Sequence, residues 1–382
     1  MGRVGNVLKF GDFSSGAVIH IVTGNTLRNQ HAMAKAKKKK LPKDFDEILQ
    51  AGDFEAFKAV FESCDVNAYG GYGKEPALAK CWQCPESWAQ WLVEQGADLT
   101  ATDEYGATPL HNWAHCWTQN VDVLLKLGAD VNAVSRHRGT ALHSAAKSHK
   151  PENVRKLIQW GAQIDVLNAE RHTPLEAALC VCRTINIEEM VQLAEILLDA
   201  GAERTPRMRE FVTRIGEKFE FLRADYNPES VDKVSAALDR LYQIFDVEPV
   251  PHRYVHDGVS PIVINAQEEN IFAALWQQLV PGIGAANSLQ GEVIRIAGKI
   301  IYELDGNGGI NWDADYKKMA DAFLEYVSQG NALPEQLLEE TRLLIALLKK
   351  KKGEPHRLVE LSVIWVTANL QPIRLDNVKY KR

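Results

Sequence analysis

Residues 103–134 read DEYGATPLHNWAHCWTQNVDVLLKLGADVNAV, the clearest copy of a unit that recurs along the first half of the chain. Thr108-Pro109-Leu110-His111 stands near its start, and Gly128-Ala129-Asp130-Val131-Asn132 stands near its end. Thr140 and Thr173 open similar stretches, so this threonine recurs at intervals of 32 and 33 residues. A fixed period of this length indicates a repeat protein.

Each copy carries the residues that begin and end a pair of helices. Threonine caps the free N–H groups of the first helix, and proline suits its first position. Leu124 and Leu125 supply the apolar face of the second helix, and Gly128 ends it where a left-handed residue is favoured. One such pair cannot bury its own apolar face, so the units are expected to stack on one another.

The period and the Thr-Pro-Leu-His and Gly-Ala-Asp-Val-Asn signatures resemble those of ankyrin repeats. The resemblance implies a solenoid of helical pairs. Together with the helical pattern of the C-terminal half, it predicts an all-α fold: an ankyrin-repeat solenoid followed by an all-helical C-terminal domain. It also implies a binding surface rather than an enzyme. In that family the histidine of the signature links adjacent turns by hydrogen bonds, which predicts a structural role for His111 and His143.

Two further units are more divergent, which brings the expected total to about five between residues 44 and 205. Residues 74–99 keep the frame but lose the threonine and histidine, and residues 44–67 have the pattern of an N-terminal cap. In the last unit the interval from Gly161 to Gly201 is 40 residues, which predicts an insertion around 182–189, between its helices. Residues 206–382 are expected to form the separate helical domain.

Residues 1–43 are expected to form a flexible basic arm, because they contain nine Lys or Arg and one acid. Lys35 to Lys40 include five lysines, which raises the alternative of a nucleic-acid adaptor, although nucleic acid is not the expected partner. Met33 stands where a natural start would lie. We therefore predict that residues 1–32 are dispensable for folding.

Residues 44–203 contain 24 acids and 12 Lys or Arg, which predicts a negative surface for a basic protein partner. Aromatic residues often dominate the energy of an interface. Trp88 and Trp91 have the apolar spacing of a helix core. Trp82, Trp113 and Trp117 are expected to be exposed on one side of the solenoid. The predicted partner-binding residues are Trp82, Trp113, Trp117, Asp103, Glu104, Arg136 and His137.

Cysteines and histidines in the same units raise the question of a zinc site. Cys81 and Cys84 have the spacing of metal ligands, and Cys116 with His115 takes the equivalent place in the next unit. Adjacent helices pack about 8–10 Å apart, whereas zinc ligands lie within about 2.3 Å of the metal. The sequence therefore favours small buried thiols and no metal.

The C-terminal half contains apolar stripes at helical spacing and predicts five to seven helices. A polar cluster of Glu292, Arg295, Asp313 and Asp315 is the candidate site if this half is an enzyme. A closed ion pair there would argue against catalysis. Residues 305–316 resemble a calcium loop loosely, but Ile310 and Tyr316 replace its glycine and glutamate. Residues 305–316 are better explained as the end of one helix and the start of the next, with Asn311 as the cap and with Asp313 and Asp315 near the N-terminus of the second helix.

These features predict a non-catalytic protein-interaction module, of the inhibitor or immunity type, that binds a basic partner. The alternative is an enzyme of unknown reaction in the helical half, targeted by the repeats. Rossmann and P-loop glycine patterns are absent from the sequence, so no cofactor is predicted. No apolar run reaches the roughly 18 residues of a membrane span. A cytoplasmic protein with reduced thiols is expected.

Overall fold

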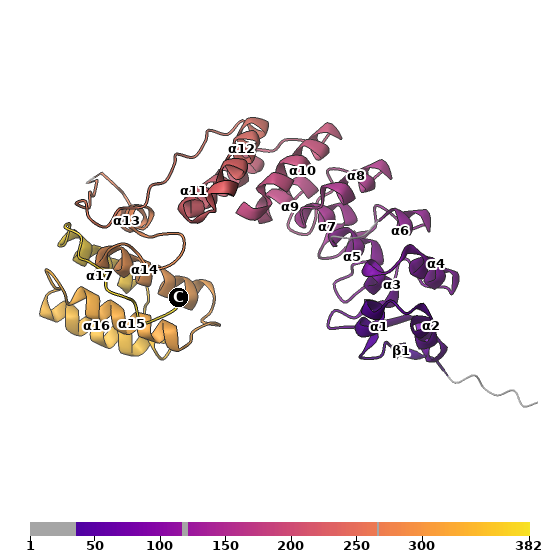
Figure 1. Cartoon of the computed structure of the whole chain (residues 1–382), viewed down its shortest axis with the longest axis horizontal. Coiled ribbons are helices and arrows are strands. Elements are labelled where there is room, and N and C mark those ends of the chain that lie inside the picture. The colour runs from indigo at the N-terminus through magenta and orange to yellow at the C-terminus, as the bar shows by residue number, and fades with distance from the viewer. Residues whose placement is uncertain (1–35, 117–120, 266) are drawn as a thin grey trace, which may run out of the picture. The chain divides into compact units, whose positions relative to one another are not determined.

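The computed structural model describes residues 36–116, 121–265 and 267–382 (Figure 1). Within this part the chain is mostly helical, with short strands among the first repeats. The predicted all-α class is confirmed at that level. None of the helices in the described ranges has the length and apolar character needed to span a membrane. Trp117 and the proposed extension 1–32 lie outside the described residues.

The first strand of the described residues lies in the lysine run. Strand β1 (Lys38–Lys40) pairs in parallel with β2 (Cys64–Gly70), which pairs in antiparallel with β3 (Glu75–Pro76). The backbone N–H of Leu41 donates to the carbonyl of Tyr69 at 2.9 Å, and the Leu41 side chain is buried. The prediction of an arm over residues 1–43 is therefore wrong from Lys38 onward, because β2 offers free main-chain groups for that segment to pair with.

Five helical pairs follow one another, each a first helix and a second helix of a repeat (Figure 1). The first helices contact their neighbours from α3 to α5, α7 and α9. Between the third and fourth pairs, β4 (Val134–Ser135) and β5 (Gly139–Thr140) form a hairpin. The pairs are α1 (Phe45–Ala51) with α2 (Phe54–Ser63), α3 (Ala77–Lys80) with α4 (Glu86–Glu94), α5 (Pro109–His115) with α6 (Asp122–Lys126), α7 (Ala141–Lys147) with α8 (Pro151–Gln159), and α9 (Pro174–Val181) with α10 (Ile187–Asp199).

The ends of these helices follow the predicted chemistry. Thr173 accepts a hydrogen bond from the N–H of Glu176 at 3.2 Å, and the Glu176 carboxylate accepts one from the N–H of Thr173. Gly128 has φ of 101° after α6, where its N–H donates to Leu125. The predicted insertion in the last unit is a 3₁₀ turn (Thr184–Asn186) before a long α10.

A sixth helical pair continues the stack. Helices α11 (Pro206–Leu222) and α12 (Pro228–Phe245) pack on α9 and α10, with a 3₁₀ turn (Arg223–Asp225) between them. Their apolar residues, among them Val212, Phe219 and Leu241, belong to the same hydrophobic core as the repeats. The predicted boundary after residue 205 therefore lies too early, because α9 and α10 present an apolar face that this pair covers.

A second hydrophobic core begins at Ile262. Helix α14 lies at its centre and contacts α13, α15 and α17. The stretch 246–270 precedes it without regular structure in its described residues. The helices are α13 (Ile271–Leu279), α14 (Leu289–Ile301), a π-helical turn (Tyr302–Gly306), α15 (Ala314–Val327), α16 (Glu335–Leu348) and α17 (Arg357–Thr367).

Candidate protein-binding groove

The first helices of the repeats carry a row of polar side chains at repeated positions. Counted from the capping residues Pro76, Thr108 and Thr140, the fourth position holds Lys80, Asn112 and Ser144 in turn. The seventh position holds His115 in α5 and Lys147 in α7. Positions four, seven and eight share one face of a helix, so stacking places these side chains side by side.

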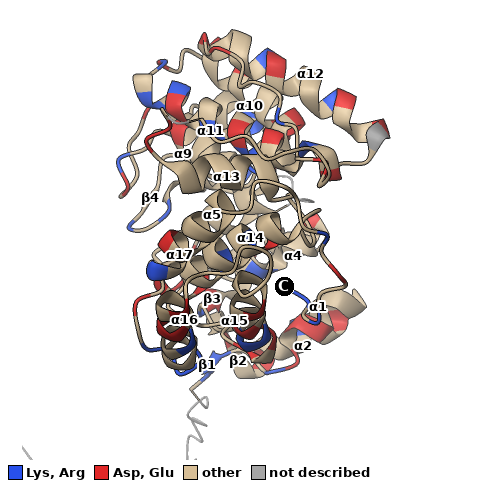
Figure 2. Cartoon of the chain, turned by 90° about the vertical axis from the view of Figure 1, so that its left-hand side faces the viewer, with Lys and Arg blue, Asp and Glu red and all other residues tan. Residues whose placement is uncertain are grey.

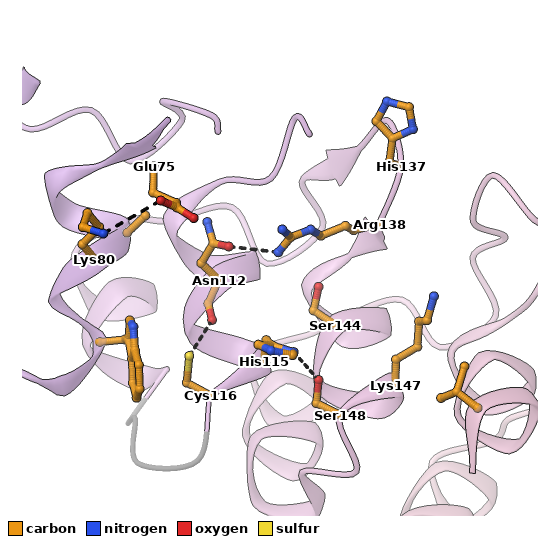
Figure 3. Close-up of a pocket in the computed structure, with 13 residues that line it drawn as sticks. Glu75, Lys80, Asn112, His115, Cys116, His137, Arg138, Ser144, Lys147 and Ser148 are labelled. Atoms are coloured by element: carbon orange, nitrogen blue, oxygen red, sulfur yellow. Dashed lines mark hydrogen bonds and ion pairs between the residues drawn. The ribbon is translucent and has the colours of Figure 1, made fainter. Parts of the chain in front are cut away.

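This row lines a hollow of about 670 Å³ (Figure 3). The β4–β5 hairpin adds His137 and Arg138 to its rim, and α3 is followed by Trp82 at its edge. The Arg138 guanidinium donates to the Asn112 side chain at 2.9 Å and lies 3.4 Å from the carboxylate of Asp103. Figure 3 shows the Arg138 side chain extending toward Asn112, with the Ser144 side chain nearby.

Two more hollows extend the first. One of about 510 Å³ shares Trp82, His115 and Lys147 with it and continues to Arg183. Another, of about 470 Å³, shares Lys80 and continues to Lys74 and the β1 end of the chain. We call these three neighbouring hollows, which share lining residues, the groove.

The histidines of the signature hold the repeats below this groove, as predicted. His111 Nδ1 lies 2.8 Å from the Thr108 hydroxyl, and its Nε2 lies 2.9 Å from the carbonyl of Gly139 in the next unit. His143 repeats this with Thr140 and with the carbonyl of His172 at 3.0 Å. Burial lowers the pKa of both rings, that of His143 to about 4, so they act as neutral hydrogen-bonding groups.

The predicted tryptophans divide between core and groove. Trp113 is only 1% exposed, and its Nε1 donates to the carbonyl of Leu78 at 3.0 Å. The prediction that it is exposed is wrong, because the preceding α3 is only four residues long and the indole lies against it. Trp82 is half-buried and lines the groove. Trp88 and Trp91 pack among phenylalanines, as expected for core residues.

The four other predicted binding residues also differ in exposure. Asp103 is buried, and its carboxylate accepts hydrogen bonds from the N–H groups of Tyr105 and Ala107. It therefore stabilises the turn. The prediction that it contacts a partner is wrong, because its side chain is not accessible. Glu104 and Arg136 are exposed but do not line the groove's hollows. His137 is exposed and does line it.

The charge of the groove is opposite to that expected for the repeat surface. Eight basic residues line it, and the acids among its described lining residues are Asp46 and Glu75. Both acids pair with Lys80, at 2.9 and 3.9 Å. The groove is therefore basic, whereas the binding surface predicted from the sequence is acidic. Figure 2 shows acidic residues along α1, α2 and α10. The basic residues are Lys40, Lys43, Lys74, Lys80, Arg138, Lys147, Lys150 and Arg183.

Two buried polar atoms in the groove lack a hydrogen-bond partner. They are the hydroxyl of Ser144 and Nε2 of His149, in side chains that are 7% and 4% exposed. Buried polar atoms are nearly always hydrogen-bonded in folded proteins. Sequence reasoning missed four groove residues: Ser144, Lys147, His149 and Arg183. Ser144 and Lys147 stand at positions that recur at fixed distances from the capping residues, and this recurrence could have indicated them.

The cysteines near the groove pack as thiols. Cys81 and Cys84 are buried, and Cys116 donates to the carbonyl of Asn112 at 3.1 Å. Burial raises the pKa of Cys81, and it raises that of Cys116 to about 11, so both stay protonated at neutral pH.

The polar cluster of the C-terminal core is closed on itself. Arg295 donates to the Glu292 carboxylate at 2.6 Å, and both side chains are buried. Tyr380 donates to the same carboxylate at 2.6 Å, and Arg295 also donates to the carbonyl of Arg382 at 2.7 Å. Their charged groups are thus satisfied by each other and by the C-terminal segment.

Asp313 and Asp315 do not join that pair directly. Asp313 caps α15 by accepting from the N–H of Tyr316, and it pairs with the Arg382 side chain. The sequence predicted Asn311 as the cap of this helix, and that prediction is wrong, because the cap is Asp313. The Asn311 N–H donates to the buried Glu303 carboxylate instead. Asp315 pairs with Lys318 at 2.9 Å on the surface.

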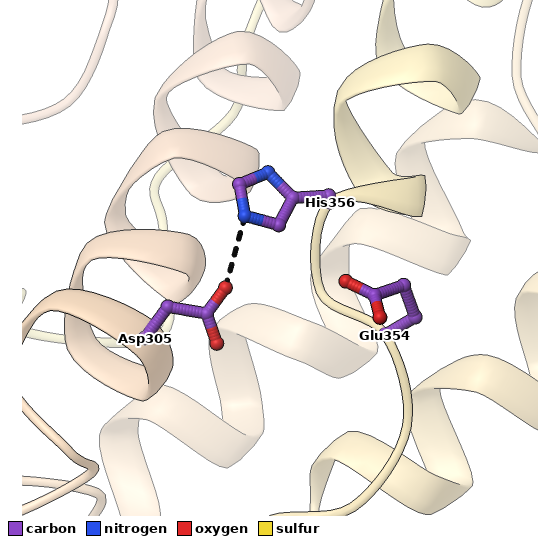
Figure 4. Close-up of side chains that lie close together, drawn as sticks. All are labelled: Asp305, Glu354 and His356. Atoms are coloured by element: carbon purple, nitrogen blue, oxygen red, sulfur yellow. Dashed lines mark ion pairs between the residues drawn. The ribbon is translucent and has the colours of Figure 1, made fainter.

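One group in the described residues could hold a metal ion. Asp305, Glu354 and His356 offer ligand atoms that all lie within 4.8 Å of one another, and the three side chains converge (Figure 4). Sequence reasoning missed it, because Asp305 lies some 50 positions before the other two in the chain. All three are exposed, and the 3.0 Å ion pair between His356 and Asp305 accounts for their approach without a metal.

Comparison with known proteins agrees with this geometry. Residues 77–168 match the family described as ankyrin repeats, in three copies. A protein of fowlpox virus (strain NVSL), named as an ankyrin repeat protein, is 48% identical over 58 residues. That match covers 14% of this chain and 11% of the viral protein, so the two share only a short segment. Residues 77–168 of this chain are ankyrin repeats, a module of protein–protein interaction.

Proposed function

We propose that this protein is a non-catalytic binding protein that holds a segment of a protein partner in the groove. The unpartnered Ser144 hydroxyl and His149 Nε2 carry the proposal. A buried polar atom without a partner costs about 1–3 kcal/mol, which a bound peptide main chain would offset with its own N–H and C=O groups. Trp82 beside them adds an aromatic anchor.

The same reasoning assigns the C-terminal core a structural role. Glu292 and Arg295 direct their charged atoms at each other, Tyr380 and Arg382, which leaves none of them for a substrate. The rival function is an enzyme that uses this cluster, and it needs a carboxylate open to the solvent. An inhibitory role is the expected consequence of binding: the partner's activity should fall in proportion to the protein added.

Capture of a partner from cell lysate by the tagged full-length chain tests the proposal. We expect Trp82→Ala and Ser144→Ala each to reduce recovery of the partner at least about tenfold. Ser144→Ala should leave stability unchanged or raise it slightly, because it removes an unsatisfied buried hydroxyl. A loss of binding with retained stability therefore separates recognition from folding.

Trp160→Ala is the matched control, since Trp160 is 42% exposed at the end of α8 and does not line the groove. Equal recovery by wild type, Trp82→Ala and Ser144→Ala would refute binding in the groove. A basic partner that contacts the acidic outer residues, such as Glu104, would give that result.

A further inference from the structure

We infer that the occupant of the groove is an acidic, extended protein segment of about nine residues. This inference rests on the proposed function and adds the chemistry and length of the partner. It reverses the expectation from net charge, because the repeat region as a whole is negative while the groove is positive.

Bases outnumber acids among the side chains that line the groove, although Lys74, Lys80 and Arg138 pair with carboxylates of the chain. Lys147 has its nearest carboxylate, that of Glu170, at 3.9 Å, and that side chain is 61% exposed. Arg183 is exposed at the far end of the groove and has no ion pair among the described residues. Burial, and then the charges of Arg138 and Lys150, lower the pKa of His115, as expected beside a positive surface. Carboxylates of a partner would pair with Arg183 and add a second, closer contact to Lys147.

Between Lys80 in α3 and Arg183 after α9 the groove crosses four consecutive first helices, and its third hollow, at α1, lies beyond this stretch. Neighbouring helices pack roughly 8–10 Å apart, so three steps span roughly 25–30 Å. An extended chain advances roughly 3.3 Å per residue, which gives about nine residues. The Ser144 hydroxyl and the His149 ring nitrogen lie near the middle of this path and suit the alternating C=O and N–H groups of such a chain.

Nucleic acid fits this surface less well, although it is also anionic. Duplex DNA carries one charge per roughly 1.7 Å and would bring phosphates beyond the groove. There it would meet the acidic residues of α1, α2 and α10, which repel it. A short acidic peptide places its charge within the groove alone.

Selection of random nonapeptides displayed on phage against the full-length chain tests the inference. We expect Asp and Glu to be enriched at least about twofold over the input library. Selected peptides should bind about tenfold more weakly to Lys147→Glu/Arg183→Glu, and also more weakly as salt is raised, because exposed charges are screened. Both side chains are at least partly exposed, so this variant should fold normally.

The matched control is Lys126→Glu/Arg155→Glu, which changes the net charge equally on α6 and α8, outside the groove. It should retain the affinity of wild type. Selected peptides without acidic enrichment would overturn the inference and leave the proposed function standing, whereas no selected peptides at all would count against both. Equal losses in the two double variants, or displacement of the peptide by a 20-nucleotide single strand at similar concentration, would also overturn it.

Discussion

The groove of the repeat stack and the Glu292 cluster of the C-terminal core differ in how their buried polar groups are satisfied. In the C-terminal core Glu292, Arg295 and Tyr380 satisfy one another. In the stack, Ser144 and His149 keep polar atoms without partners beside a basic groove. A buried polar network that satisfies all its members specifies a core, whereas an unsatisfied buried polar atom costs free energy until a partner reaches it. The difference supports our proposals that the repeats carry the binding surface and that the polar cluster of the second core is structural.

The largest effect is expected from a residue that looked like a binding residue and proved to be core. Trp113→Ala should lower the free energy of unfolding by about 4–5 kcal/mol, because it opens a large cavity and leaves the carbonyl of Leu78 unpaired. Urea denaturation of the full chain measures this. Trp82→Ala should cost less than half as much; similar losses would mean that Trp82 is also a core residue.

The second-largest loss in the free energy of unfolding is expected from the buried ion pair of the second core. Arg295→Ala leaves the Glu292 carboxylate buried without its cation and should cost about 3–4 kcal/mol, again by urea denaturation. Lys318→Ala breaks an exposed pair at the same helical spacing, with Asp315, and should cost less than about 0.5 kcal/mol. A loss of less than 1 kcal/mol for Arg295→Ala would show that solvent reaches the pair and would reopen the catalytic alternative.

Acid should affect the repeat stack through its neutral histidines. Burial lowers the pKa of His143 from 6.5 to about 4, so below pH 6.5 the unfolded chain binds a proton that the folded chain does not. The contribution of His143 to the free energy of unfolding is therefore fully present above pH 6.5. It falls as the pH drops toward 4 and changes little below that. This single histidine contributes up to about 3 kcal/mol of the loss.

Melting temperature measured from pH 7.5 to 4 checks this expectation. His143→Gln should be less stable at neutral pH but should lose less stability on acidification than wild type. An unchanged pH slope in that variant would contradict the assignment of a neutral His143.

The sequence predicted the local chemistry of the repeats well, and the candidate site only in part. The caps, the signature histidines and the core roles of Trp88 and Trp91 are confirmed. Of the predicted binding residues, Trp82 and His137 line the groove, while Trp113 and Asp103 are buried. Exposure of a helical side chain depends on how long the neighbouring helix is, and the sequence of the unit itself does not contain that information.

The sixth helical pair carries only part of the sequence signature that marks the repeats. Thr205-Pro206 follows Thr173 by 32 residues and opens α11 as Thr-Pro opens α5 and α9. The rest of the repeat signature is absent from 206–245, so the sequence predicted helices there without assigning them to the stack. Their membership is decided by the apolar face that α9 and α10 leave to be covered.

The sequence alone determined the repeat architecture, because capping, helix termination and periodic burial are local and recur at fixed spacing. Only the tertiary structure decided which side chains face the groove, that its charge is basic within an acidic region, and that Glu292 and Arg295 close on Tyr380 and Arg382. Those properties arise from contacts between residues far apart in the chain, where packing selects one face of each helix for a neighbour and leaves the other for solvent or a partner.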